Sequence, residues 1–207
     1  GVYIDDVLQP RVNGAFFDFF DVGRIEVLRG PQGTLYGRNA SGGAIKIETR
    51  RPTFNWTGGG ELSAGNWNSL SYKGLLSGPI MADKLAFSLS GTRTRHDGYL
   101  YSTNYKRRVG KVDNSAERIK LLYTPNENLD IWLSAHFIQD YSESSVGVPM
   151  LVAPNVTGTA ATGGPRDLTF TENLGELGSP FLYNNGGSLH AAYRRRPMQL
   201  NLISGYG

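Results

Sequence analysis

The chain has 207 residues, a formal net charge of +3 and no cysteine. The lack of cysteine excludes disulfides and thiolate metal sites, and so small a charge gives no reason to expect a nucleic-acid partner. No run of 18 apolar residues is present, which excludes a membrane-spanning helix. The composition is still compatible with transmembrane β-strands, because these need only about 10 residues of alternating apolar and polar side chains.

The first quarter of the chain contains three segments predicted as strands. Residues 2–8 are β-prone by composition, and residues 24–28 and 44–49 follow, the last with apolar and polar side chains in alternation. Within the first segment, Asp5 and Asp6 are predicted to point to opposite faces of a strand. That arrangement argues against a cooperating acid–base pair.

Glycine is dense between the second and third predicted strands. Such density indicates left-handed or otherwise restricted backbone, or backbone packed closely against another element. A phosphate-binding loop is not supported, because neither Gly-x-Gly-x-x-Gly nor a closing Gly-Lys-Ser/Thr occurs and no amphipathic helix follows. The glycines are Gly30, Gly33, Gly37, Gly42 and Gly43.

These residues carry a resemblance to a known family. Ile-Glu-Val-Leu-Arg-Gly-Pro at 25–31, Leu-Tyr-Gly at 35–37, Ala-x-Gly-Gly-x-Ile-x-Ile at 40–47 and Arg-Pro at 51–52 resemble the end of a TonB-dependent receptor plug. The run at residues 2–7 resembles an earlier plug strand of the same family. Together they cover about the first quarter of the chain, in the family's order and spacing.

The resemblance implies roles for several residues of this stretch. Arg29, with Glu26 as a second member, would fasten the plug to glutamates of a surrounding barrel wall. The alternative is that Arg29 is simply an exposed arginine at the end of a strand, without a role in fastening the plug. The plug's backbone motif would consist of Gly30, Pro31, Gly37, Gly42 and Gly43.

Residues 11–21 hold four phenylalanines and allow two interpretations. Aromatic clusters usually pack in a core or against a neighbouring domain. In the family, however, this segment carries an outward-facing loop that touches the ligand. Arg11, Phe16 and Phe17 could then form the floor of a cavity for an anionic aromatic chelate.

From residue 57 onward the chain is predicted to form seven antiparallel strands. Apolar and polar residues alternate in several of them. Every second connection between them is short, although the first, near Trp67, is short too; transmembrane barrels likewise have short periplasmic turns and long outer loops. A soluble sandwich would also alternate. The strands are residues 58–66, 69–78, 84–96, 114–124, 129–140, 185–194 and 198–206. The face predicted to meet lipid carries Phe87, Leu89, Ile119, Leu121, Ile131, Leu133, Leu189 and Leu200.

Two long connections are predicted at one end of these strands. Residues 97–113 combine Tyr99 and Tyr101 with several lysines and arginines. The first interpretation of these charges is ordinary solvation in a loop; the second is attraction to lipopolysaccharide phosphates, and the third is contact with an anionic ligand. Residues 141–184 show no periodicity, which is typical of a functional or mobile loop.

No catalytic centre is apparent in the sequence. The three histidines lack metal-ligand spacing, and neither a nucleophile elbow nor a cysteine nucleophile is present. We therefore expect no enzyme, and no cofactor beyond iron within a transported chelate.

The resemblance implies an all-β chain with a small mixed plug portion. Residues 1–53 would be the C-terminal part of a plug domain, and residues 54–207 the first strands of a partial transmembrane β-barrel. Since no signal peptide or TonB box is seen, we expect an internal piece of a longer receptor in a Gram-negative outer membrane.

The function that the resemblance implies is TonB-dependent uptake of a scarce substrate, most often a ferric siderophore and sometimes cobalamin or carbohydrate. The partners would be TonB with ExbB and ExbD, the extracellular ligand, and outer-membrane lipid with lipopolysaccharide. The alternative is a passive porin-like or adhesive β-protein without energy coupling.

Overall fold

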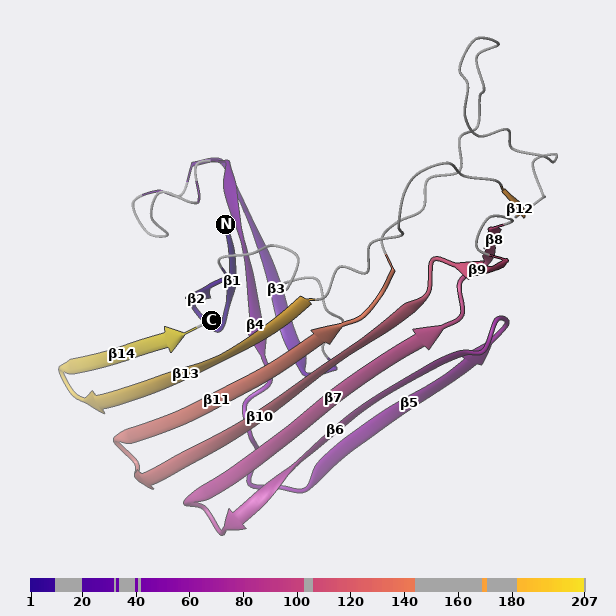
Figure 1. Ribbon diagram of the computed structural model, residues 1–207. Coiled ribbons are helices and arrows are strands. Elements are labelled where there is room, and N and C mark those ends of the chain that lie inside the picture. The colour runs from indigo at the N-terminus through magenta and orange to yellow at the C-terminus, as the bar shows by residue number, and fades with distance from the viewer. Residues whose placement is uncertain are drawn as a thin grey trace.

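The computed structural model describes residues 1–9, 20–31, 33, 40, 42–102, 106–143, 169–170 and 182–206. Within these ranges its elements are fourteen strands in three sheets. No helix in the described part of the chain has the length and apolar character needed to cross a membrane. Figure 1 shows a four-stranded sheet standing against one face of a larger seven-stranded sheet.

The smaller sheet, which we call the plug sheet, is mixed. Its order is β2-β1-β4-β3, with β1 parallel to β4 and the other neighbours antiparallel. The two later strands agree with the sequence prediction, because alternating apolar residues occupy both. The strands are β1 (Val2–Ile4), β2 (Val7–Leu8), β3 (Val22–Arg29) and β4 (Gly43–Thr49).

The prediction of a single strand over residues 2–8 is wrong. Asp5 and Asp6 adopt φ angles of 47° and 64°, so the chain turns back there and β2 pairs with β1. Aspartate tolerates this left-handed conformation better than most residues, and two in succession can form a tight primed hairpin turn. Asp5 is consequently buried, whereas Asp6 is exposed.

The larger sheet, which we call the wall sheet, confirms the predicted seven antiparallel strands. The seven strands follow one another across the sheet in the same order as along the chain, as in an up-and-down barrel wall. Its strands are β5 (Thr57–Gly65), β6 (Ser69–Met81), β7 (Leu85–His96), β10 (Val112–Asn126), β11 (Leu129–Asp140), β13 (Leu182–Arg195) and β14 (Met198–Tyr206). The predicted domain boundary at residues 53–54 falls in the segment that connects the two sheets.

Alternation along the wall sheet separates two faces, as predicted. Leu121 of β10 lies opposite Phe87 of β7 and Leu133 of β11, so all three share the face turned away from the plug sheet. The pairing register of the strands places the other predicted lipid-facing residues on the same face: Leu89, Ile119, Ile131, Leu189 and Leu200. Large apolar side chains are exposed here, with Leu133 at 49%.

The apolar core lies between the two sheets. Val2, Ile4 and Ile47 of the plug sheet cluster with Ala116 of β10 and Ile138 of β11, and all five are buried. The plug sheet therefore packs on the inward residues of two central wall strands.

Connections differ at the two ends of the wall sheet. Turns at residues 82–84, 127–128 and 196–197 are short and lie at one end of the sheet (Figure 1). At the opposite end, β5 joins β6 through the short turn at residues 66–68, and β7 and β11 end where the longer connections to β10 and β13 begin. Residues 97–113 were predicted as a loop, but they hold β8 (Leu100–Ser102) and β9 (Arg107–Val109). These strands pair with each other, and β12 (Thr169–Phe170) pairs with β8.

Leu133→Arg should impair assembly of the full-length protein in a membrane. The side chain faces outward, where a mid-membrane arginine costs about 2–4 kcal/mol. Ser63→Arg is the matched control, because Ser63 of β5 lies on the inward face opposite Ser71. The measurement is the fraction of folded, heat-modifiable barrel in isolated membranes; equal assembly of the two variants would contradict the assigned faces.

Candidate functional site: a buried charge cluster between plug and wall

Two cations of the wall sheet point at the plug sheet. Arg118 and Lys120 lie two positions apart on β10 and hence on the same, inward face. They are among the most deeply buried side chains of the described residues, at 2% and 1% exposure. Charges so far from water require partners.

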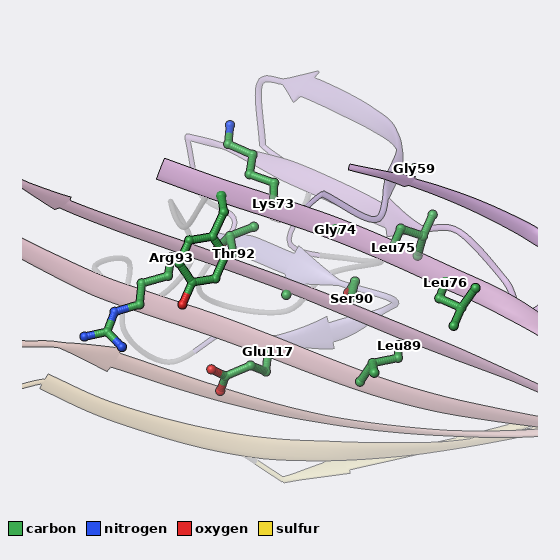
Figure 2. Close-up of a pocket in the computed structure, with 12 residues that line it drawn as sticks. Gly59, Lys73, Gly74, Leu75, Leu76, Leu89, Ser90, Thr92, Arg93 and Glu117 are labelled. Carbon is green, nitrogen blue, oxygen red and sulfur yellow. The ribbon is translucent and has the colours of Figure 1, made fainter. Parts of the chain in front are cut away.

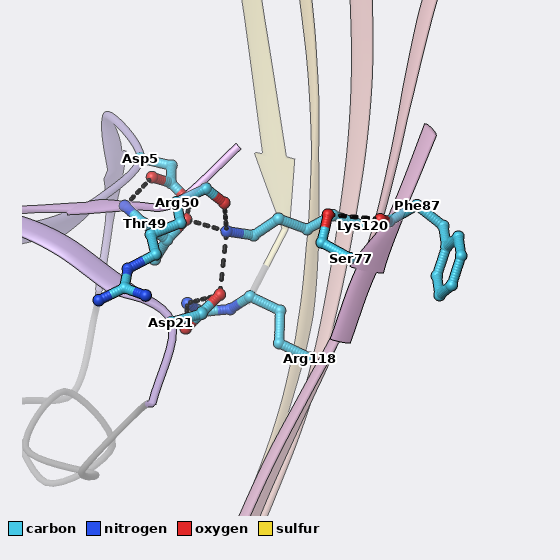
Figure 3. Close-up of polar contacts among 8 residues, drawn as sticks. All are labelled: Asp5, Asp21, Thr49, Arg50, Ser77, Phe87, Arg118 and Lys120. Atoms are coloured by element: carbon cyan, nitrogen blue, oxygen red, sulfur yellow. Dashed lines mark hydrogen bonds and ion pairs between the residues drawn. The ribbon is translucent and has the colours of Figure 1, made fainter. Parts of the chain in front are cut away.

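Asp21 supplies the first partner. It lies just before β3 and is 1% exposed. One Arg118 guanidinium nitrogen donates to both carboxylate oxygens, at 2.9 and 3.2 Å, and Lys120 Nζ lies 3.0 Å from Oδ2 (Figure 3). The backbone N–H of Arg50 also donates to the Asp21 carbonyl at 2.7 Å, which fixes the β3 and β4 ends together.

Lys120 also reaches the end of β4. Its Nζ donates to the Arg50 carbonyl at 2.9 Å and to the Thr49 hydroxyl (Figure 3). That hydroxyl in turn donates to Asp5, whose other carboxylate oxygen accepts the Thr49 N–H at 2.8 Å. The contacts thus run from the wall through the end of β4 to the β1–β2 turn.

This charge cluster, defined as Asp5, Asp21, Arg118 and Lys120, is electrically balanced. It contains every buried aspartate, glutamate, lysine and arginine among the described residues. Burial alone would raise the pKa of Asp21, but the two cations outweigh burial and hold that pKa below its ordinary value. Asp21 is therefore ionised at neutral pH.

The segment after β4 is held to the wall by further contacts. The Arg51 guanidinium lies 4.8 Å from the centre of the Trp132 ring, which meets His190 edge-on at 4.6 Å. The N–H of Thr53 donates to Ser77 Oγ at 3.0 Å. The chain therefore stays attached to the wall between its exit from the plug sheet and the start of β5.

The structure places the sequence-predicted locking residues elsewhere. Arg29 is exposed at the end of β3, and no ion pair is recorded for it within the described residues. Glu26 pairs at 3.2 Å with Arg24 on the surface. Arg29 and Glu26 are not brought together with the charge cluster, and their locking role remains a prediction because no glutamate partner lies among the described residues.

Other predicted site residues divide into described and undescribed ones. Tyr99 and Tyr101 are exposed in the connection that follows β7. Gly30 and Gly43 take φ angles of 84° and 141°, and a Cβ on Gly43 would lie 2.5 Å from the Leu28 carbonyl oxygen. Pro31 and Gly42 are described as non-strand residues. Arg11, Phe16, Phe17 and Gly37 lie outside the described residues.

Sequence reasoning missed the cluster, although one signal was present. In the sequence, Arg118 and Lys120 alternate with Ile119 and Leu121, which the alternation places on the lipid-facing side. Two cations spaced by two on the opposite, shielded face call for carboxylate partners. Nothing local pointed to Asp21, which is 97 residues away from Arg118.

A wall of up-and-down strands with an apolar outer face and a separate sheet docked on its inner face is the arrangement expected of part of a plugged membrane barrel. Comparisons with known proteins point to a family. Residues 1–44 match the family model described as TonB-dependent Receptor Plug Domain. Residues 1–44 are therefore a plug portion of the TonB-dependent receptor type, and the chain as a whole is similar to outer-membrane receptors of Gram-negative bacteria.

Relatives and solved structures agree with this assignment. The pesticin receptor of Yersinia pestis is 35% identical over 127 residues, which are 61% of this chain and 19% of that protein. The ferrioxamine receptor of Yersinia enterocolitica is 30% identical over 119 residues, 58% of this chain and 16% of that one. The ferric yersiniabactin uptake receptor of Yersinia pestis matches with a TM-score of 0.70 and 26% identity, covering 99% of this chain and 31% of that one. The chain thus spans less than a third of the length of these relatives.

Asp21→Asn should release the plug sheet from the wall. The change leaves two buried cations without their shared carboxylate, and breaking such a buried pair costs about 3–5 kcal/mol. In the full-length receptor we expect faster hydrogen exchange of the β3 and β4 amides. Asp6→Asn is the control, because Asp6 is exposed on the plug sheet and its surface pair with Lys46 is worth about 0–1 kcal/mol. Exchange that is equally slow in both variants would contradict the role of Asp21.

Acid should weaken the same attachment. The folded-state pKa of Asp21 is depressed, so its stabilising contribution is fully present above the unfolded value of about 3.9 and is lost as pH falls through the lower folded value. Protection of the β3–β4 amides, corrected for intrinsic exchange, should stay constant from neutral pH to about 5 and decline below about 4. Asp21→Asn should remove the part of the decline that this residue causes.

Proposed function

We propose that this chain is the part of an outer-membrane receptor where plug meets wall, and that the whole protein takes up a ferric siderophore in a TonB-dependent manner. The observation that carries the proposal is the charge cluster: a separate sheet is fixed inside the wall by contacts that can be broken and remade. The names of relatives, a ferrioxamine receptor and a ferric yersiniabactin uptake receptor, support the substrate class.

Reversible docking follows from the balance of charge. Burying four charges costs desolvation energy that their mutual attraction only partly offsets, so buried ion pairs fix geometry more than they add stability. If the plug sheet moves away, Asp5 and Asp21 leave with it, and water can hydrate all four groups. The cluster therefore specifies one closed position without making release prohibitive.

The remaining chemistry divides between the two ends of the wall. Tyr99 and Tyr101 would contact the arriving chelate together with Arg11, Phe16 and Phe17, while TonB with ExbB and ExbD would supply energy from the opposite side. Iron would enter only within the chelate, and the chain would hold no cofactor of its own. Outer-membrane lipid and lipopolysaccharide would cover the apolar face.

Uptake measured with and without TonB tests the proposal. Cells producing the full-length receptor should accumulate iron from its ferric siderophore only when TonB is present, whereas binding of the chelate at the cell surface should persist without TonB. Asp21→Asn should alter accumulation or leakage more than surface binding. Equal accumulation in cells lacking TonB would instead indicate a passive channel.

A further inference from the structure

The plug sheet stands over a row of cations on the inward side of the wall sheet. Arg118 and Lys120 lie beneath it on β10, and Lys120 is the nearer of the two to the short turns. Figure 3 shows both side chains reaching from the wall toward the plug sheet. Further toward the short turns, Arg51 lies 4.8 Å from the centre of the Trp132 ring and Arg194 lies near the end of β13. We call Arg51, Arg118, Lys120 and Arg194 the cation track.

A hollow of about 250 Å³ continues from the charge cluster along this track. Arg51 and Arg194 line it, together with Asp6 of the β1–β2 turn and Asp130 of the wall. Its lining on the wall sheet lies nearer the short turns than Lys120 does. Short turns mark the periplasmic end of an outer-membrane barrel, so the track leads from the buried cluster toward the periplasm.

The carboxylates near the track lie mostly on the plug side. Among the described residues, Asp5, Asp6 and Asp21 belong to the plug part of the chain. Asp130 belongs to the wall sheet, where it pairs with Arg194 at 2.9 Å. A plug sheet that moves off its wall would therefore take three carboxylates away from the track.

Arg51 stays with the wall although it follows β4 in the chain. Its guanidinium rests on Trp132, and the N–H of Thr53 donates to Ser77 Oγ at 3.0 Å, so this segment is fixed to wall residues. Movement of the plug sheet leaves four cations and the single carboxylate of Asp130 on the inner wall, which is a net charge of +3. Such a surface attracts anions.

We propose that the cation track is a transit site for an anionic chelate, uncovered when the plug sheet moves. The inference rests on the proposed function, since it needs a plug that moves to admit a cargo. The guanidinium and ammonium groups that hold Asp21 in the closed position bind carboxylate or phenolate oxygens of the cargo in the open one. The same groups repel a cationic chelate, so the track also selects cargo by charge.

The test uses the full-length receptor in detergent and two simple metal complexes as probes, ferric EDTA as the anion and cobalt(III) hexaammine as the cation. Asp21→Asn removes the carboxylate that Arg118 and Lys120 share. This variant should bind ferric EDTA about tenfold more tightly than the wild type, because the cations regain an anionic partner. Adding Lys120→Met should reverse the gain, and the cobalt complex should show none. Isothermal titration calorimetry on assembled, heat-modifiable receptor measures the affinities.

Lys73→Met is the matched control, because it removes a cation from the inward face of the wall outside the track. Lys73 of β6 lies opposite Glu61 of β5. Figure 2 shows Lys73 and Leu76 projecting to opposite sides of β6. Added to Asp21→Asn, Lys73→Met should leave the binding of ferric EDTA unchanged. Asp5→Asn, which removes the other carboxylate of the charge cluster, provides the same comparison if Asp21→Asn assembles poorly.

Three outcomes overturn the proposal. They are a carboxylate variant that binds ferric EDTA no better than the wild type, a loss on Lys73→Met as large as that on Lys120→Met, and an equal gain for the cobalt complex. Each of these results is compatible with TonB-dependent uptake, whereas accumulation in cells lacking TonB would contradict the proposed function itself. The two proposals can therefore fail separately.

Discussion

Two cations on β10 can be buried only because the plug sheet brings carboxylates to them. With the plug sheet docked but Asp21 and Asp5 replaced by neutral residues, Arg118 and Lys120 would be buried without a carboxylate partner. Without the cations, the buried carboxylates would be equally costly. The docked position of the plug sheet, the joined ends of β3 and β4 and the tight β1–β2 turn all depend on this pairing.

Apolar packing alone would specify that position less well. Among the described residues, the buried cluster shared by the two sheets consists of small or aliphatic side chains, such as Ala116 and Ile138 beside Val2 and Ile47. Hydrophobic burial is non-directional, so such a surface tolerates sliding. The ion contacts have fixed distances and directions, and they select one register between sheet and wall.

Local patterns were sufficient to predict much of the fold. Alternation in β10 and β11 predicted both faces, because one face is turned outward and the other is turned toward the plug sheet. The turn at Asp5 and Asp6 was missed, because the residues on both sides of it are β-prone and predicted a continuous strand.

Only the half of the charge cluster that lies on the wall sheet could be predicted from the sequence. The polar face showed its cations, but their carboxylates come from a different sheet, and no local period encodes which sheets will meet.

β10 serves two environments at once, with Arg118 and Lys120 on one face and Ile119 and Leu121 on the other. A slip of one residue in its pairing would exchange them, placing both cations in lipid at about 2–4 kcal/mol each near mid-membrane. The same residues that hold the plug sheet therefore also penalise misaligned strands while the wall assembles, so that a barrel able to insert is already a barrel able to accept its plug.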